Sequence, residues 1–200
     1  MRRRVFLIGI LIQSGAWTAS AVPITYRVTV DTSSIAGTLG SLDFNFNPGP
    51  LVSQTAGAQI LNFRSNGSLA GGPLPAPVTL NNGNGFNDCF EDFTFGSMLT
   101  FDVSLFGPAL SFPNGTATSG SAFSFSMFSN VAGTIPVLTN NPSGFAVLLA
   151  VNLDGTTAAT SFSTATSVQP VPEPETFVLI GAALIWCTCL RFRLRVNVSN

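Results

Sequence analysis

The chain has 200 residues, only 8% of them charged, and it contains neither histidine nor lysine. Without histidine it cannot form a Ser-His-Asp triad, a Cys-His dyad or a histidine-ligated metal site, and without lysine it cannot form a Ser-Lys pair. Residues 22–172 hold two arginines against seven acidic residues, a net charge of −5, so they offer no basic patch that could neutralise nucleic-acid phosphates.

Residues 1–21 have the pattern of a Sec-type signal peptide. A basic start at residues 1–4 precedes an apolar run at residues 5–12, and Ala19 and Ala21 form a small-x-small cleavage site. No polar spacer separates the arginines from the apolar run, which disfavours the twin-arginine alternative. We expect cleavage after Ala21 and export of the remainder.

Four segments of the following region alternate apolar with polar side chains, as half-buried strands do. They are residues 25–30, 42–47, 99–105 and 122–127. Residues 145–153 are apolar on both faces, which is typical of a strand inside a sheet. Weaker strand candidates are residues 58–64, 77–80, 93–95 and 159–163.

Turn-forming residues separate these segments, for example at residues 47–50, 81–85 and 140–142. No stretch outside the two ends of the chain has helical periodicity. Short strands with Gly, Pro and Asn between them predict an all-β fold over residues 22–163, an antiparallel β-sandwich or a jelly roll.

Residues 164–174 are rich in Ser, Thr, Ala and Pro and lack apolar periodicity. Each proline fixes its own φ and restricts the residue before it, so this composition predicts a partly extended linker. The linker is expected to hold the domain away from a membrane and to end in Pro172-Glu173-Pro174.

An apolar run of 14 residues, 177–190, follows and is itself followed by Arg191, Arg193 and Arg195. As a helix it is about 21 Å long, against a hydrocarbon core about 30 Å thick, so it spans if the arginines snorkel or the bilayer thins. The basic end should stay cytoplasmic. Residues 175–195 are therefore predicted to form a transmembrane helix with a basic tail.

Motif, apolar run and basic cluster together resemble the PEP-CTERM sorting signal of Gram-negative bacteria. The resemblance implies that exosortase, an integral membrane transpeptidase, recognises Pro172, Glu173 and Pro174 and removes the tail. It also implies delivery to the cell surface or extracellular matrix, in association with exopolysaccharide or biofilm production. The alternative is a permanent single-pass anchor in the inner membrane.

A second resemblance covers the domain itself. Residues 26–37 and 40–49, with Asp31-Thr32-Ser33-Ser34 and Leu42-Asp43-Phe44, are similar to the opening of a subgroup of PEP-CTERM proteins. Residues 87–96 and 151–155 are similar in the same subgroup. This likeness implies the same sorting route and no particular chemistry.

Candidate groups for catalysis are few. Cys187 and Cys189 lie two residues apart in the predicted helix and cannot pair there, while Cys89 is expected to be a buried small apolar side chain. Glu91 and Asp92 could act as the acid and base of a glycosidase, but neighbouring strand residues point to opposite faces. We therefore predict no catalytic residue and a protein that is not an enzyme.

Two sets of oxygen-bearing side chains could bind a ligand. Asp43, Asn45 and Asn47 alternate along one predicted strand and could bind a carbohydrate, although the outer face of an amphipathic strand has the same pattern. A second set precedes and begins a later strand and could hold calcium, although a solvated turn has the same composition. Its members are Asn82, Asn84, Asp88, Glu91 and Asp92.

The sequence thus predicts an exported, non-catalytic surface or matrix protein that is anchored at the inner membrane until exosortase processes its tail. Its expected partners are that enzyme, the membrane and exopolysaccharide, with no nucleic acid and no required cofactor. The alternative is a carbohydrate- or calcium-binding β-sandwich that stays anchored in the membrane.

Overall fold

A computed structural model describes residues 23–74, 76–83 and 87–172. The predicted signal peptide with Ala19 and Ala21, residues Asn84, Glu173 and Pro174, and the predicted helix and basic tail, including Cys187, Cys189, Arg191, Arg193 and Arg195, lie outside these residues. Among the described residues, no helix has the length and apolar character needed to cross a membrane.

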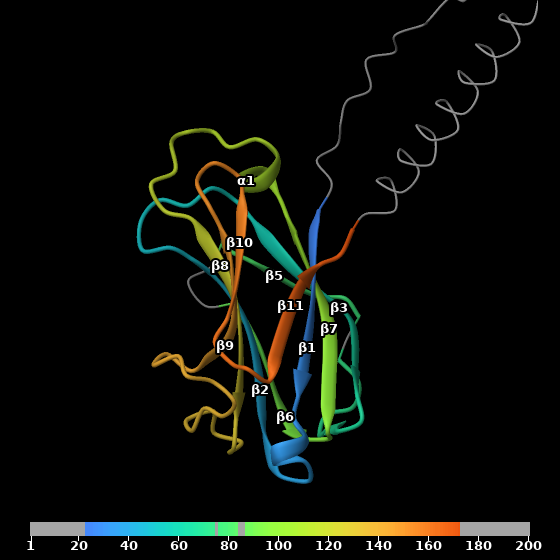
Figure 1. The fold of residues 1–200 in the computed structure, drawn as a ribbon. Coiled ribbons are helices and arrows are strands. Elements are labelled where there is room, and N and C mark those ends of the chain that lie inside the picture. The colour runs from blue at the N-terminus through green and yellow to red at the C-terminus, as the bar shows by residue number, and fades with distance from the viewer. Residues whose placement is uncertain (1–22, 75, 84–86, 173–200) are drawn as a thin grey trace, which may run out of the picture.

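The described chain is all-β and forms two antiparallel sheets, which face each other as in a β-sandwich (Figure 1). Sheet A has the strand order β11-β1-β7-β3-β5. Its strands are β1 (Ile24–Asp31), β3 (Gly57–Ser65), β5 (Val78–Asn81), β7 (Met98–Phe106) and β11 (Thr166–Pro170).

Sheet B has the strand order β10-β9-β8-β2-β6-β4. Its strands are β2 (Leu39–Pro48), β4 (Ser68–Leu69), β6 (Asp88–Thr94), β8 (Ser121–Phe128), β9 (Phe145–Val151) and β10 (Thr157–Ser161). Two short helical turns, η1 (Ser33–Ile35) and α1 (Pro108–Ser111), lie in connections between strands.

The core lies between the sheets and is dominated by phenylalanine. Phe44 of sheet B meets Phe101 of sheet A edge to face, with ring centroids 5.1 Å apart, and Phe125 lies 4.9 Å from the Phe101 ring. All three side chains are buried. Three of the four alternating segments predicted from the sequence supply these residues, because side chains on a strand point alternately to its two faces.

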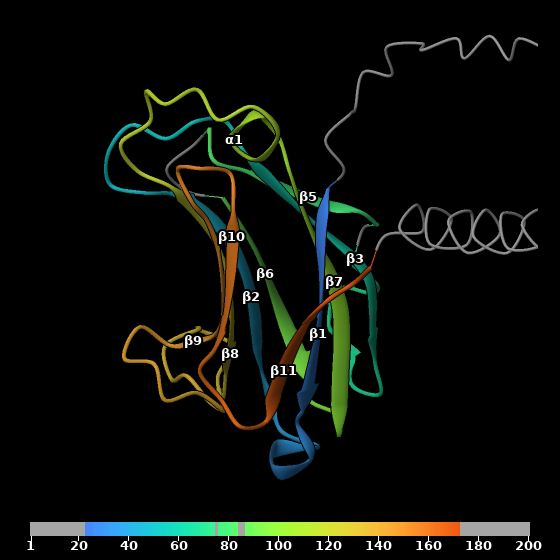
Figure 2. The ribbon, with the colours of Figure 1, turned by 45° about the horizontal axis from the view of Figure 1, so that its top comes forward.

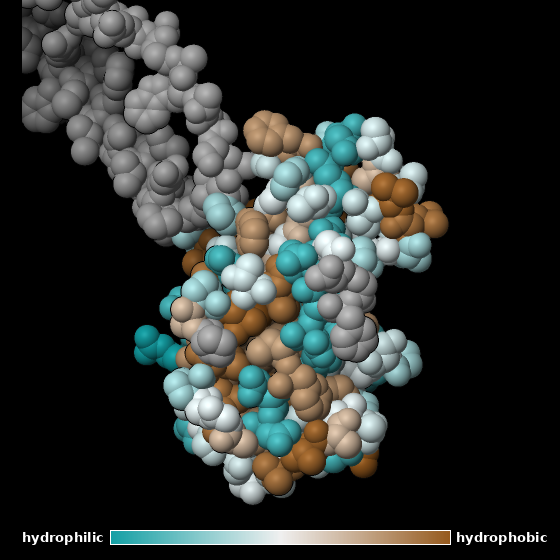
Figure 3. All heavy atoms as spheres, turned by 180° about the vertical axis from the view of Figure 1, so that it is seen from behind, coloured by the Kyte–Doolittle hydropathy of each residue, from teal (hydrophilic) through white to brown (hydrophobic). Residues whose placement is uncertain are grey.

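The predicted strand at residues 145–153 is confirmed as an interior strand, since β9 pairs with both β8 and β10. The weaker candidates are also strands, although β6 begins at Asp88 and is longer than expected. Hydrophilic and hydrophobic residues are interspersed on the face seen in Figure 3. Because residues 23–172 hold only two arginines and seven acidic residues, contact with water relies mainly on neutral hydroxyl and amide side chains.

The expectation of a linker over residues 164–174 was wrong for its first half. Residues 166–170 form β11, which pairs with β1 in the register Tyr26↔Pro170 to Val30↔Thr166. The sequence of β11 has no apolar alternation, and its extended form is stabilised by backbone pairing with β1. The two ends of the described chain therefore leave the sandwich at the same corner (Figure 2).

Candidate functional site

The polar side chains that the sequence predicts on one face of a strand, Asp43, Asn45 and Asn47, lie on the outer face of sheet B. In β2, Leu42, Phe44 and Phe46 are fully buried in the core. The intervening Asp43, Asn45 and Asn47 therefore point away from the core, as the alternation predicts. Each of these three residues is only partly exposed to solvent, which is less than expected for side chains on a fully solvated strand face.

Three oxygens in this row lack partners. The Oδ1 atoms of Asp43, Asn45 and Asn47 are inaccessible to solvent and accept no hydrogen bond from any described residue. A buried acceptor without a donor costs about 1–3 kcal/mol. Residues two apart along a strand are separated by roughly 6.6 Å. The three side chains thus form an evenly spaced row whose Oδ1 atoms are covered by neighbouring atoms.

Neighbouring strands add hydroxyls beside this line. Asp43 lies between Phe90 of β6 and Ser126 of β8, and Asn45 is paired in the same way with Asp88 and Ser124. Both serines are buried. A ligand rich in hydroxyl groups could hydrogen-bond to these oxygens and to the serines only by displacing the atoms that cover them.

An open groove adjoins the row, with a volume of about 400 Å³. Its polar side includes Asn47 and Ser124, and its apolar side includes Phe145, Leu148 and Leu153. Groups that fix orientation next to apolar surface are characteristic of small-molecule and sugar sites. These apolar residues are not predicted as part of a site from the sequence, and the signal that could have found them is the two-sided apolar pattern of residues 145–153.

The opposite end of this face is covered by the connection between β8 and β9. Ser41 Oγ donates to the carbonyl oxygen of Asn130 at 3.0 Å, and the rings of Phe90 and Phe128 lie 6.5 Å apart. A Cβ on Gly133 would come within 2.7 Å of the Phe90 ring, which shows how closely the connection packs there. The connection therefore covers the Ser41 end of this face, and the groove adjoins its Asn47 end.

Asp43 is the titratable group of the row. Burial, together with the negative charge of Asp88 on the neighbouring strand, raises the pKa of its carboxyl to about 6. At neutral pH the side chain is an anion without a cationic partner among the described residues.

Cys89 lies on the inner face of β6, half-buried and packed against the core. It is a free thiol. Burial raises the pKa of this thiol to about 11, and the carboxylates of Glu91, Asp88 and Asp43 act in the same direction. The expectation of a small apolar side chain fits this position.

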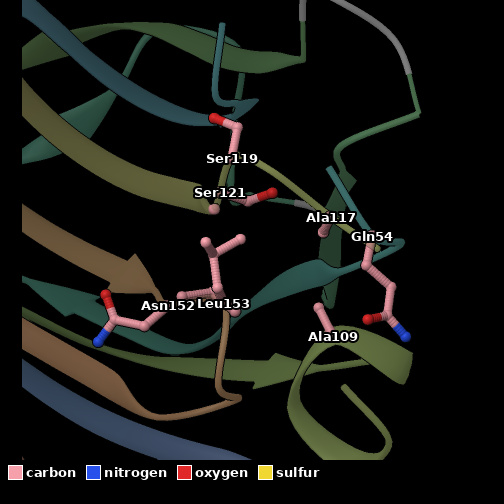
Figure 4. Close-up of a pocket in the computed structure, with 9 residues that line it drawn as sticks. Gln54, Ala109, Ala117, Ser119, Ser121, Asn152 and Leu153 are labelled. Carbon is pink, nitrogen blue, oxygen red and sulfur yellow. The ribbon is translucent and has the colours of Figure 1, made fainter. Parts of the chain in front are cut away.

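Asn82, expected as a calcium ligand, is instead fully engaged in structural hydrogen bonds. Its Oδ1 accepts from the Ala56 backbone N–H at 2.9 Å, and its Nδ2 donates to the Gln54 carbonyl and to Ser121 Oγ, both at 2.7 Å. The pocket lined by Gln54 and Ser121 (Figure 4) has a volume of about 10 Å³. That volume is far too small for a sugar ring.

The remaining predicted calcium ligands are divided between two faces of β6. Asp88 and Asp92 pair with Asn45 and Ser41 on the outer face, whereas Glu91 pairs with the inward-facing Leu42. Within the described ranges, no three acidic or cysteine side chains are grouped closely enough to hold a metal ion. The structure therefore does not bring together Asn82, Asp88, Glu91 and Asp92 as one ligand set.

The predicted sorting motif begins where the sandwich ends. The Val171 backbone N–H donates to the carbonyl oxygen of Thr25 at 2.8 Å, and Pro172 is the next residue and the last that the structure describes.

Comparison with protein-family models, with curated proteins and with solved structures found nothing that matches this chain.

Proposed function

We propose that this is an exported, non-catalytic surface or extracellular-matrix protein, sorted through a PEP-CTERM tail that exosortase processes. A Sec signal at residues 1–21 would start export, and a transmembrane helix with Arg191, Arg193 and Arg195 would hold the chain at the inner membrane. Glu173, between two prolines, would be the recognition element. The nucleophile belongs to the processing enzyme.

The observation that carries the proposal is the pairing of β1 with β11. It joins the first and last strands of the described chain, so this fold is formed by residues between the predicted signal peptide and the predicted sorting motif. Because the last hydrogen bond of the domain involves Val171, a cut after that residue would not remove any strand of the described fold.

The test is the intact mass of the mature protein from cells with and without the processing enzyme. We expect a loss of the tail that depends on the enzyme and that Glu173→Gln abolishes, while Glu175→Gln, a matched change outside the motif, leaves it intact. An unchanged mass in cells that contain the enzyme would overturn tail processing and leave a permanent anchor as the alternative.

A second function, binding of a hydroxyl-rich glycan, is supported by the row of Asp43, Asn45 and Asn47 beside an apolar groove. A glycan that displaced the atoms covering their Oδ1 oxygens would supply the hydrogen-bond donors that these oxygens lack. A sugar offers hydroxyl donors and an apolar ring face together, which suits this combination. Binding would give the delivered protein a role in a polysaccharide matrix.

The second function is tested with the full-length chain in detergent micelles, titrated calorimetrically with a neutral glucan hexasaccharide. We expect saturable binding that Asn45→Ala weakens at least tenfold and that Gln169→Ala, an exposed change on sheet A, leaves unaffected. No heat of binding, or equal binding by both variants, would contradict a glycan site on this face.

A further inference from the structure

The opposite face of the molecule gathers the two arginines of the described chain. β1, β7 and β3 lie side by side in sheet A (Figure 1). Arg27 of β1 is paired with Asp102 of β7, and Arg64 of β3 is paired with Thr100 two residues earlier on β7. Side chains two apart on a strand share a face. The only cations of residues 23–172 therefore converge on the outer face of β7.

Asp102 holds Arg27 in a fixed orientation. The Nε of Arg27 donates to Oδ1 at 2.8 Å, and its Nη2 donates to Oδ2 at 3.1 Å, a two-point contact that favours one geometry. Asn62 Nδ2 adds a third hydrogen bond to Oδ2 at 2.8 Å. Asp102 is 4% exposed, whereas the Arg27 side chain is 57% exposed. The carboxylate is thus satisfied, and the remaining guanidinium N–H groups face solvent.

A β-bulge brings Asn62 and Arg64 to this face. The register of β3 against β7 shifts between Leu61 and Arg64, and Asn62 has a φ of 54°, a left-handed conformation that is unfavourable for most residues but tolerated by Asn. Bulges of this kind redirect side chains at functional positions. Phe63, between the two, packs inward with its ring 6.3 Å from that of Phe44.

Arg64 is the arginine whose side chain is available to a ligand. Its guanidinium makes no hydrogen bond or ion pair with any described residue, and its side chain is exposed. It lines an open pocket of about 390 Å³ together with Arg27, Asn62, Thr100 and Asp102. With two guanidiniums and one carboxylate, the pocket has a net charge of +1 in a described chain whose net charge is −5.

We propose that this pocket binds a carboxylate, carried either by a free small acid or by a uronic acid residue of a polymer. A guanidinium offers two parallel N–H donors whose spacing matches the two oxygens of a carboxylate. One net positive charge suits a monoanion, and Asp102 disfavours a dianion. This site is separate from the groove on sheet B and does not depend on tail processing.

The test is calorimetric titration of the full-length chain in detergent micelles with D-glucuronate, using D-glucose as the uncharged match. We expect saturable binding of glucuronate alone. Arg64→Gln should weaken it at least tenfold, and Arg64→Lys should weaken it less, because lysine keeps the charge but loses the planar fork. Asp88→Asn, which alters net charge on the other sheet, should change affinity less than twofold.

Asn62→Gly provides a second variant, since glycine tolerates the left-handed backbone while removing the bond to Asp102. We expect it to weaken glucuronate binding severalfold. In the wild-type chain, the Nε–H resonance of Arg64 should shift on titration, which tests the contact without any substitution. Equal binding of glucose, equal binding by Arg64→Gln, or an unmoved Arg64 resonance would overturn the proposal.

An oligogalacturonate separates the two sources of the carboxylate. Binding at least tenfold tighter than that of the monosaccharide, per uronate residue, would identify a polymer as the ligand. Equal affinity would identify a small free acid.

Discussion

The two outer faces of the sandwich arise from the same strand alternation but treat their carboxylates in opposite ways. On sheet A, Asp102 receives three hydrogen bonds from Arg27 and Asn62, which hold the pKa of its carboxyl below the usual range despite burial. On sheet B, Asp43 has no cation beside it, and burial together with Asp88 raises its pKa to about 6. Hydrogen bonds from neighbouring strands outweigh burial at Asp102, whereas at Asp43, which lacks such donors, burial is the main cause of the shift.

The largest effect on stability should come from substitutions on the inner faces, where both sheets carry buried apolar side chains. Phe44→Ala in β2 and Phe101→Ala in β7 each remove a fully buried ring and leave a cavity, so each should lower the free energy of unfolding by about 3–5 kcal/mol. Urea denaturation followed by circular dichroism measures both. A loss below about 1 kcal/mol for either variant would mean that its sheet does not share the common core.

On sheet A, Arg27→Gln should destabilise the protein and reshape its pH dependence. The folded-state pKa of Asp102 lies below its unfolded value, so the ion pair stabilises the fold above that unfolded value and loses its effect as pH falls through the folded pKa. The melting temperatures of variant and wild type should therefore differ most between pH 5 and 7 and converge at lower pH.

Arg64→Gln is the control for this change, because Arg64 has no partner among the described residues and its loss should leave the melting curve nearly unaltered. A gap between Arg27→Gln and wild type that persists below pH 3 would show that the arginine acts through packing of its stem.

On sheet B, Asp43→Asn should change stability in the opposite direction and stabilise the protein at neutral pH. The folded-state pKa of about 6 lies above the ordinary value of 3.8, so the unfolded chain ionises first and stability falls as pH rises between these values. Because the side chain is partly exposed, screening limits the gain from the substitution to about 1 kcal/mol at pH 7. The gain should vanish at pH 4.

Asp154→Asn serves as the comparison, since Thr156 hydrogen bonds lower the pKa of that exposed carboxyl and the substitution should not stabilise. Thermal unfolding at both pH values decides, and a stability gain for Asp43→Asn that is equal at pH 4 and pH 7 would contradict a charge effect.

The smallest change concerns Cys89, for which no change in stability is expected. In a Cys187→Ser, Cys189→Ser background, iodoacetamide at pH 8 should alkylate the native thiol roughly a hundredfold more slowly than the urea-unfolded one, because the raised pKa leaves little thiolate. Mass spectrometry against time measures the rate. Comparable rates in the two states would place Cys89 outside the apolar environment described above.

The sequence predicted the inward faces well because period-two alternation with phenylalanine is a strong local signal. Leu42, Phe44 and Phe46 are buried as expected. The strand β11 was missed because residues 166–170 carry no such alternation, and their extended form comes from hydrogen bonds to a strand more than 130 residues earlier. The local composition of residues 166–170 therefore does not predict this pairing.

The candidate sites also have some features that the sequence predicts and others that it does not. The outward direction of Asp43, Asn45 and Asn47 was predictable, but their unpartnered oxygens depend on which residues β6 and β8 place beside them. The ion pair of Arg27 and Asp102 joins residues 75 positions apart, and the bulge at Asn62 has no sequence signature of its own. Both follow from strand order, which alternation alone does not determine.

The pairing of β11 with β1 also limits where the tail can be cut. Cleavage anywhere from Thr166 to Val171 would strip hydrogen bonds from β1 and leave its backbone amides open to another chain, a known route to aggregation. A processed protein that stays soluble and monomeric must therefore have been severed beyond Val171. On the proposed sorting route, β11 would therefore set the earliest position at which the tail can be removed without opening the sandwich.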